Sequence, residues 1–245
     1  MHTDFILSNI SDVLEDALDA TTVLDQGIPH VAVCEYLLQS IYLKITGYQE
    51  QKLKCILWIL ANDNFDFRYR YLKEANDYRE CSQLDDKCKV LRELKDILDD
   101  KGYPYQFPTK DMIDSQIDAI RSFLINRFET SIFSRCLPRD FSRFSSFSSK
   151  IHYIENGYFT SSKIFGGDHI LTNAFKTAYR HRNRCAHNLL SYQNNIPSLN
   201  DLATDDEGAD NYFSRIFVLF LVDNVFTQMF KHYVHNRRNF VKTPY

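Results

Sequence analysis

The chain has 245 residues, of which 44% are hydrophobic and 25% are charged, and its net charge is -3. These values are ordinary for a soluble globular protein, and a chain of this length can bury a sizeable core without disulfides or metals to hold it. The longest apolar run, residues 216–222, is far shorter than the ~20 residues of a membrane-spanning helix, so no membrane association is expected. Glycine and proline are scarce, at 7 and 6 residues, which favours long helices over many short strands.

The six cysteines contain neither a C-x-x-C pair nor the spacing of a zinc site. The first residues, MHTDFILSNISDVLED, include acids from the fourth position and no basic segment, so they do not resemble a signal peptide. We therefore expect a cytoplasmic protein with reduced thiols and with no metal or other cofactor.

Apolar residues at helical spacing predict four segments in the first hundred residues. Residues 4–24 form the first helix. The second covers residues 29–46 and is stopped by Gly47. Residues 50–62 are densely apolar and are expected to be buried on most sides, and residues 82–100 form a fourth helix.

The segment GYPYQFPTK, residues 102–110, is rich in proline and aromatic residues and predicts an ordered turn rather than a flexible linker. Within it, Thr109 is placed to cap a long helix that follows. The Ser- and Phe-biased residues 139–150 carry phenylalanines three residues apart with interleaved basic residues. They fit a short amphipathic helix that docks on the bundle, or else a surface that stacks single-stranded RNA.

Two further helices are predicted on either side of an acidic loop, residues 194–210. The first follows Asp168, a suitable N-cap, and carries a basic motif. The second, residues 211–235, is apolar on nearly all sides, as is typical of the central helix of a bundle. The sequence thus predicts a single all-α domain, a multi-helix bundle in which a core of about residues 108–237 packs against an N-terminal helical part of about residues 1–101.

The stretch YRHRNRCAHN, residues 179–188, concentrates positive and titratable side chains, and residues 169–200 contain no acid at all. In a mildly acidic protein this asymmetry creates a local positive field, for which phosphate is the obvious ligand.

One residue of this stretch conflicts with the helical pattern. Arg180, Asn183 and His187 share one face of a helix, whereas Arg182 falls on the apolar face, seven residues after Phe175. A guanidinium on an apolar face is costly unless it is paired. We therefore expect either that the helix breaks before His187 or that Arg182 reaches a cleft or a partner surface.

Arg182, Asn183 and His187 spell R-N-x-x-x-H, with an alanine before the histidine. This pattern closely resembles the signature of the HEPN superfamily, the "higher eukaryote and prokaryote nucleotide-binding" domains, in which a histidine follows an arginine after four to six residues. The setting is similar too, with a helix leading in and a hydrophobic helix following. The resemblance covers about residues 108–237. It implies an all-α, usually dimeric, metal-independent endoribonuclease, and many members of the superfamily are toxins or phage-defence effectors.

The resemblance also implies roles for individual residues. His187 would act as general base or acid, since an unperturbed imidazole titrates near neutral pH. Arg182 would stabilise charge on the phosphorane, and Asn183 would orient the phosphate or the histidine. Weaker candidates for binding RNA are Lys176, Arg180, His181, Arg184 and Asn188.

The expected partners follow from the same chemistry. One histidine cannot easily be base and acid in a single step, so a homodimer with a composite active site is expected, with RNA as substrate. Because an unregulated ribonuclease harms its host, a cognate inhibitor or regulatory protein is a further expected partner.

Three other interpretations remain open. The motif could belong to a non-catalytic HEPN-type module that binds RNA or a nucleotide, or to an antitoxin-like protein. The chain could instead be a helical adaptor for protein partners. The basic residues could also be only a solvated helix end that interacts with the helix dipole.

Overall fold

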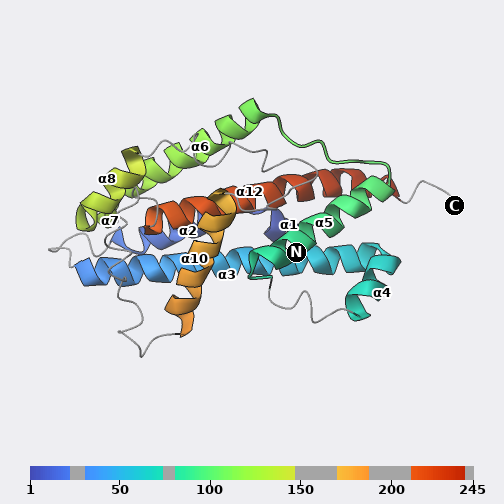
Figure 1. Cartoon of the computed structure of the whole chain (residues 1–245), viewed down its shortest axis with the longest axis horizontal. Helices are drawn as coiled ribbons and strands as arrows, with labels where there is room; N and C mark the ends of the chain where they lie inside the picture. Colours follow the sequence, from blue (N-terminus) through green and yellow to red (C-terminus); the bar gives the residue numbers. More distant parts are fainter. Residues whose placement is uncertain (23–30, 74–80, 147–169, 188–210, 241–245) are drawn as a thin grey trace.

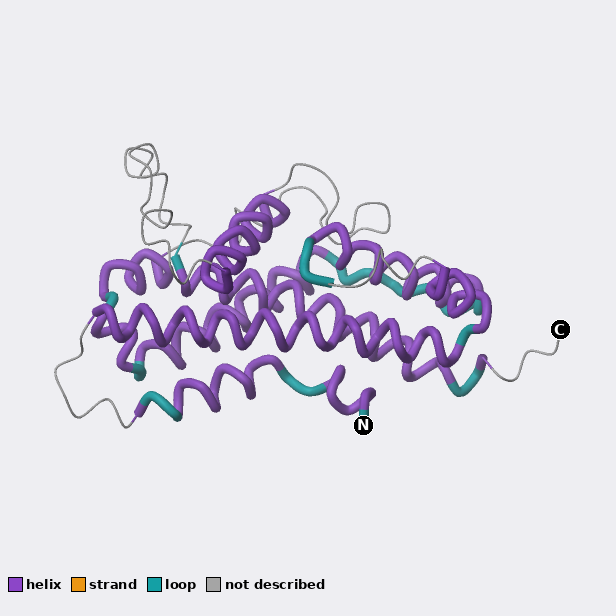
Figure 2. The backbone as a smooth tube through the Cα atoms, turned by 90° about the horizontal axis from the view of Figure 1, so that it is seen from below, coloured by secondary structure: helices purple, strands orange, loops and turns teal. Residues whose placement is uncertain are grey.

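The structure, a computed structural model, describes residues 1–22, 31–73, 81–146, 170–187 and 211–240 (Figure 1). Within these ranges the chain forms helices and no β-strand (Figure 2), which confirms the all-α class. The helices are α1 (His2–Leu7), α2 (Ile10–Asp19), α3 (Val31–Asp63), α4 (Phe65–Lys73), α5 (Leu84–Asp100), α6 (Lys110–Glu129), α7 (Ile132–Cys136), α8 (Pro138–Ser146), α10 (Ile170–His187) and α12 (Tyr212–Arg237).

The two longest helices, α3 and α12, lie side by side and run in the same direction along the molecule (Figure 1). Polar contacts fix their register: Gln49 Nε2 donates to the carbonyl of Leu219 at 3.0 Å, and the Tyr233 hydroxyl donates to Asp63 at 2.8 Å. The sequence predicts a central apolar helix at residues 211–235, and α12 confirms it. Most of the apolar residues of α12 are buried.

The other helices cover this pair. α6 runs antiparallel to α12, because Phe123 stacks on Phe220 and Phe128 packs edge-on against Phe213. α1 and α2 pack along α3, whereas α10 crosses α3 and α12 (Figure 1). The arrangement leaves α10 with one face on the core and its C-terminal turn beside the start of α12.

Side chains at the helix starts show why the helices begin where they do. The Thr109 hydroxyl accepts a hydrogen bond from the Met112 backbone N–H, as the sequence predicts, and Asn211 Oδ1 accepts from the Ser214 N–H at 2.9 Å. Each bond satisfies a backbone donor that has no partner within its helix. The segment between α5 and α6 turns at Lys101 and Gly102 and then continues without regular structure to Thr109, with the Tyr105 ring edge-on against His232 of α12, so the predicted turn is confirmed only at its start.

Two predicted helix boundaries are wrong. The helix predicted over residues 4–24 is broken after α1, because Ser8 and Asn9 adopt extended backbone angles and Asn9 caps α2. Conversely, Gly47 does not stop a helix but lies inside α3, which runs without a break from Val31 to Asp63 and so joins the two predicted segments. A helical glycine costs only about 1 kcal/mol relative to alanine, and the burial of apolar residues on both sides of it outweighs that cost. α4 has no counterpart among the helices predicted from the sequence.

Residues 139–146 of the Ser- and Phe-biased stretch belong to α8, and the later ones lie outside the described residues. Phe144 is buried, with its ring stacked on Phe213 and edge-on to Phe217 of α12, and Phe141 packs against Phe213. The interpretation as a docked amphipathic helix is therefore confirmed for α8.

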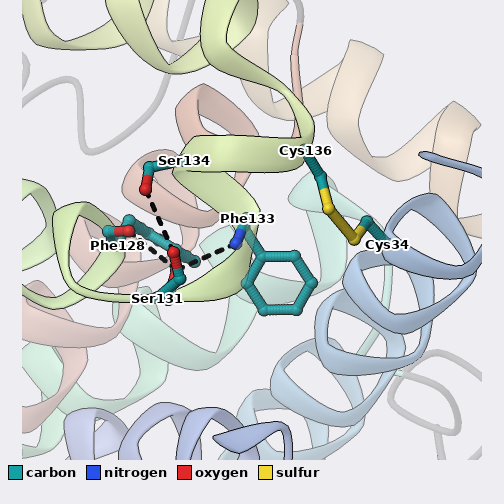
Figure 3. The surroundings of a disulfide bond; sticks show 6 residues. All are labelled: Cys34, Phe128, Ser131, Phe133, Ser134 and Cys136. Atoms are coloured by element: carbon teal, nitrogen blue, oxygen red, sulfur yellow. Dashed lines mark hydrogen bonds between the residues drawn. A yellow bond between two sulfur atoms is a disulfide. The ribbon is translucent and has the colours of Figure 1, made fainter. Parts of the chain in front are cut away.

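The expectation that all cysteines are reduced is wrong for one pair. Cys34 of α3 and Cys136 of α7 form a disulfide, with their Cα atoms 6.4 Å apart, beside the Phe133 ring and the Ser131 cap of α7 (Figure 3). The two cysteines are separated by 102 residues in the sequence, so only the packing of α7 on α3 brings them together. The other cysteines form no disulfide: Cys55, Cys81, Cys88 and Cys185.

Among the described helices, α12 is the one that is long and apolar enough to cross a bilayer, and 78% of its most apolar 18-residue stretch is buried inside the bundle. Such burial is typical of the core helix of a helical bundle.

Candidate functional site

The motif-bearing helix α10 continues without a break from Ile170 to His187. Its apolar positions, Phe175 and Ala178, are buried in the core. The Tyr42 hydroxyl of α3 donates to the carbonyl of Ala178 at 2.5 Å, which attaches the two helices at their crossing. Of the two outcomes expected for Arg182, the break in the helix is therefore excluded.

Arg182 instead reaches an acidic partner on α3. Its Nη2 group lies 3.1 Å from Glu50 Oε2, and its Nη1 group donates to Asn183 Oδ1, also at 3.1 Å. The side chains of Arg182 and Glu50 are only 22% and 12% exposed. A guanidinium on the apolar side of the helix is thus paired, as its desolvation requires, and its orientation is fixed by two partners.

A small cavity of about 10 Å³ adjoins this ion pair, large enough for about one water molecule. Polar side chains from α3, α5, α10 and the segment before α5 meet there. Gln49 and Lys87 are buried, and the Oε1 atom of Gln49 has no hydrogen-bond partner within the described ranges. The cavity is lined by Tyr42, Thr46, Gln49, Glu50, Ser82, Lys87, Phe175, Tyr179, Arg182 and Leu219.

Lys87 brings a second cation to this region. Its ammonium donates to the carbonyl of Cys81 at 3.0 Å and lies 5.5 Å from the centre of the Phe175 ring. Burial lowers the pKa of Lys87 to about 8, although the nearby Glu50 carboxylate acts in the opposite direction. The ammonium is therefore easier to deprotonate than that of a solvated lysine.

A second buried ion pair lies further along α3. Lys52 and Asp223 approach to 2.9 Å, and the Lys52 ammonium also donates to the carbonyl of Ser8. Burial raises the pKa of Asp223, and the adjacent Lys52 opposes that rise. The interface between α3 and α12 is therefore polar at its centre, despite the apolar character of both helices.

His181 is held inside the bundle near the end of α10. Its Nε2 atom lies 2.9 Å from the Tyr212 hydroxyl and 3.3 Å from Cys185 Sγ, and its ring packs edge-on against Tyr212. Burial raises the pKa of Tyr212 above its usual range. These contacts tie α10 to the start of α12, and Cys185 is buried.

The remaining predicted site residues fall into two groups: residues exposed on α10, and residues whose side chains the structure does not describe. Lys176 and Arg180 are exposed on α10, and Arg180 donates to the Thr177 hydroxyl at 3.1 Å. The backbones of Arg184 and His187 belong to α10, but their side chains, like the whole of Asn188, lie outside the described part of the chain. The structure thus brings Arg182 and Asn183 together and leaves the position of the His187 imidazole undefined.

Glu50 and Lys87 belong to the site but were not predicted from the sequence. Glu50 is a lone acid in a helical segment that is otherwise expected to be buried, and Arg182 is a lone cation on an apolar face. Two opposite charges that are both costly to bury indicate a pair, so this signal was present. Lys87 carried no such signal, because it is one of several lysines on an amphipathic helix.

No group of three His, Cys, Asp or Glu side chains that could hold a metal ion occurs within the described ranges. A scan against models of protein families finds no match to the chain, and searches of curated proteins and of solved structures find none either.

Proposed function

We propose that the protein is a metal-independent endoribonuclease of the HEPN type, in which Arg182, Asn183 and His187 act on an RNA phosphodiester. The observation that carries the proposal is the state of Arg182. A costly, partly buried guanidinium is oriented by Glu50 and Asn183, five residues before His187 on the same unbroken helix. A guanidinium that is held in one orientation by two partners, despite the cost of its desolvation, is typical of a functional site. A solvated arginine at a helix end needs no such partners.

The geometry leaves Arg182 able to bind phosphate. A guanidinium has five N–H donors, and two of them are used by Glu50 and Asn183 within the described ranges. The others are free to stabilise charge that develops on the phosphorane, and the side chain is 22% exposed, so that solvent reaches it.

The proposed reaction is a transesterification. The ribose 2′-oxygen forms a bond to the adjacent phosphorus while a base takes its proton. The bond from phosphorus to the 5′-oxygen breaks, and an acid protonates the leaving oxygen. The products are a 2′,3′-cyclic phosphate and a 5′-hydroxyl. A second copy of the chain would supply the second His187, so that one imidazole acts as base and the other as acid. We place such an enzyme among toxins or phage-defence effectors that a partner protein restrains.

One observation favours a second candidate, an RNA- or nucleotide-binding module without catalysis. The charge of Arg182 is already paired with the Glu50 carboxylate, and a guanidinium paired in this way contributes less to stabilising negative charge in a transition state.

A cleavage assay separates the two candidates. Labelled single-stranded RNA is incubated in EDTA with wild-type protein and with His187→Ala, Arg182→Ala and Arg92→Ala variants. We expect chelator-resistant cleavage that falls by at least about 100-fold in the first two variants. Arg92→Ala is the matched control, since Arg92 is an exposed arginine of α5 outside the predicted site. Cleavage that survives His187→Ala, or that EDTA abolishes, contradicts the proposal, whereas RNA binding without cleavage supports the module.

A further inference from the structure

One face of α4 exposes large hydrophobic side chains, two of them aromatic, to solvent. Phe65, Tyr69 and Leu72 are 70%, 55% and 69% exposed, although their size and apolarity favour burial. They lie at positions i, i+4 and i+7 of the helix and so share a face. On the opposite side, Phe67 is buried against the bundle, and Arg70 forms a two-pronged ion pair with Glu93 of α5. The exposed rings are therefore not needed to attach α4.

Cations alternate with these rings. The Arg68 guanidinium lies 5.2 Å from the centre of the Phe65 ring, and the Lys73 ammonium lies 4.2 Å from the centre of the Tyr69 ring. Both cations are exposed. The single acid of α4, Asp66, lies in its first turn, where a helix N-terminus favours a negative charge. We call Phe65, Arg68, Tyr69, Leu72 and Lys73 the basic-aromatic face.

We infer that the basic-aromatic face binds single-stranded RNA. Unpaired bases stack on the Phe65 and Tyr69 rings, and the flanking phosphates pair with Arg68 and Lys73. An apolar protein partner alone would leave both cations without counter-charges, whereas a polyanion supplies one phosphate for each nucleotide. Stacking on exposed rings requires unpaired bases, so the face selects single strands over duplexes.

This inference rests on the proposed function for the identity of the nucleic acid and deepens it by naming the substrate class. α4 follows the end of α3 at one end of the bundle (Figure 1), and Glu50, which holds Arg182, lies thirteen residues before that end. At 1.5 Å per residue the separation along α3 is ~20 Å. A short oligonucleotide is long enough to span this distance.

The test is a binding measurement that does not depend on cleavage. The probe is a labelled 12-nucleotide single strand with 2′-O-methyl riboses, which cannot undergo attack by a 2′-hydroxyl, and binding to the full chain is followed by fluorescence anisotropy. We expect Phe65→Ala and Tyr69→Ala each to weaken binding about tenfold, and Arg68→Gln combined with Lys73→Gln to reduce its salt dependence. A duplex of the same sequence should bind more weakly than the single strand.

Tyr36→Ala is the matched control, because Tyr36 is 66% exposed on α3 and lies away from α4 in the sequence. Affinity that is the same in wild type and in the α4 variants overturns the inference. The inference also fails if the α4 variants differ from wild type in sedimentation coefficient but not in RNA affinity. That result would identify the face as a protein interface. RNA that is bound through α4 but never cleaved contradicts the proposed ribonuclease alone, and RNA that is cleaved with no effect of the α4 variants contradicts this inference alone.

Discussion

Lys87 shows what a single buried charge does to the stability of this protein. The side chain is 1% exposed, and its ammonium contacts one carbonyl oxygen and the face of one aromatic ring. These contacts do not replace the lost water, so the pKa falls from 10.5 to about 8. A lysine that is easier to deprotonate in the folded state links folding to pH.

We predict that the free energy of unfolding of the wild type, relative to that of Lys87→Met, rises between pH 8 and pH 10.5. In this range the unfolded chain binds more protons than the folded chain, because the folded pKa is the lower one, and stability then increases with pH. The shift corresponds to a rise of up to about 3 kcal/mol. Urea unfolding of both proteins at several pH values measures it.

The comparison with a variant is needed because other groups titrate in the same range. Burial also raises the pKa of Cys81 and of Cys88 to about 11, which opposes the effect of Lys87, but both cysteines are present in both proteins. Lys44→Met is the control, since Lys44 is exposed on α3. A difference between wild type and Lys87→Met that is constant across this pH range would show that Lys87 is not desolvated as the structure indicates.

The pairing of Arg182 shows which part of the site was predictable from the sequence. The position of Arg182 on an apolar face predicted either a break in the helix or a cleft or partner surface. In the structure its guanidinium pairs with Glu50 beside a cavity for about one water molecule. The identity of the partner could not follow from periodicity alone, because Glu50 and Arg182 are 132 residues apart and meet only where α3 and α10 cross.

At the scale of helices, boundaries were predictable where a local signal determines them. Thr109 and Asn211 cap α6 and α12 through their own side chains, and these starts were found within a residue or two. The continuity of α3 through Gly47 was not predictable, because it depends on packing against α12 rather than on local preference. The break after α1 was missed because apolar spacing continues across Ser8 and Asn9.

Gly47 provides a prediction at this scale. Replacing Gly47 by alanine should stabilise the protein by about 0.5–1 kcal/mol, because alanine favours the helix. Apart from the adjoining residues and the backbone of the same helix, no atom of the described residues lies within 4 Å of the new Cβ. Chemical denaturation measures the change. Gly102→Ala is the counterpart: its site is equally open, but its φ of +78° disfavours a side chain, so this variant should be destabilised. Stabilisation by both substitutions, or by neither, would contradict the backbone described for these two positions.

At the scale of the whole molecule, the covalent link between α3 and α7 connects distant parts of the bundle. α7 leads into α8, whose Phe141 and Phe144 pack on the start of α12, where Tyr212 contacts His181 of α10. The disulfide at Cys34 and Cys136 therefore adds a constraint to the end of the bundle that holds the C-terminal turn of α10. The sequence carried no sign of it, since the cysteine spacing fits no framework and the pairing depends on tertiary packing.

Reduction of this disulfide should lower the free energy of unfolding by about 2–5 kcal/mol, because the bond closes a long loop and restricts the unfolded chain. Thermal and urea unfolding with and without reductant measure the loss, and Cys34→Ser should match the reduced wild type and show no further response to reductant. Thiol titration of the unfolded, unreduced chain should find four free thiols. A reductant effect that persists in Cys34→Ser would mean that a different cysteine pair is bonded. Six thiols would mean that no disulfide is present and that the contacts of α8 with α12 have to fix this end of the bundle.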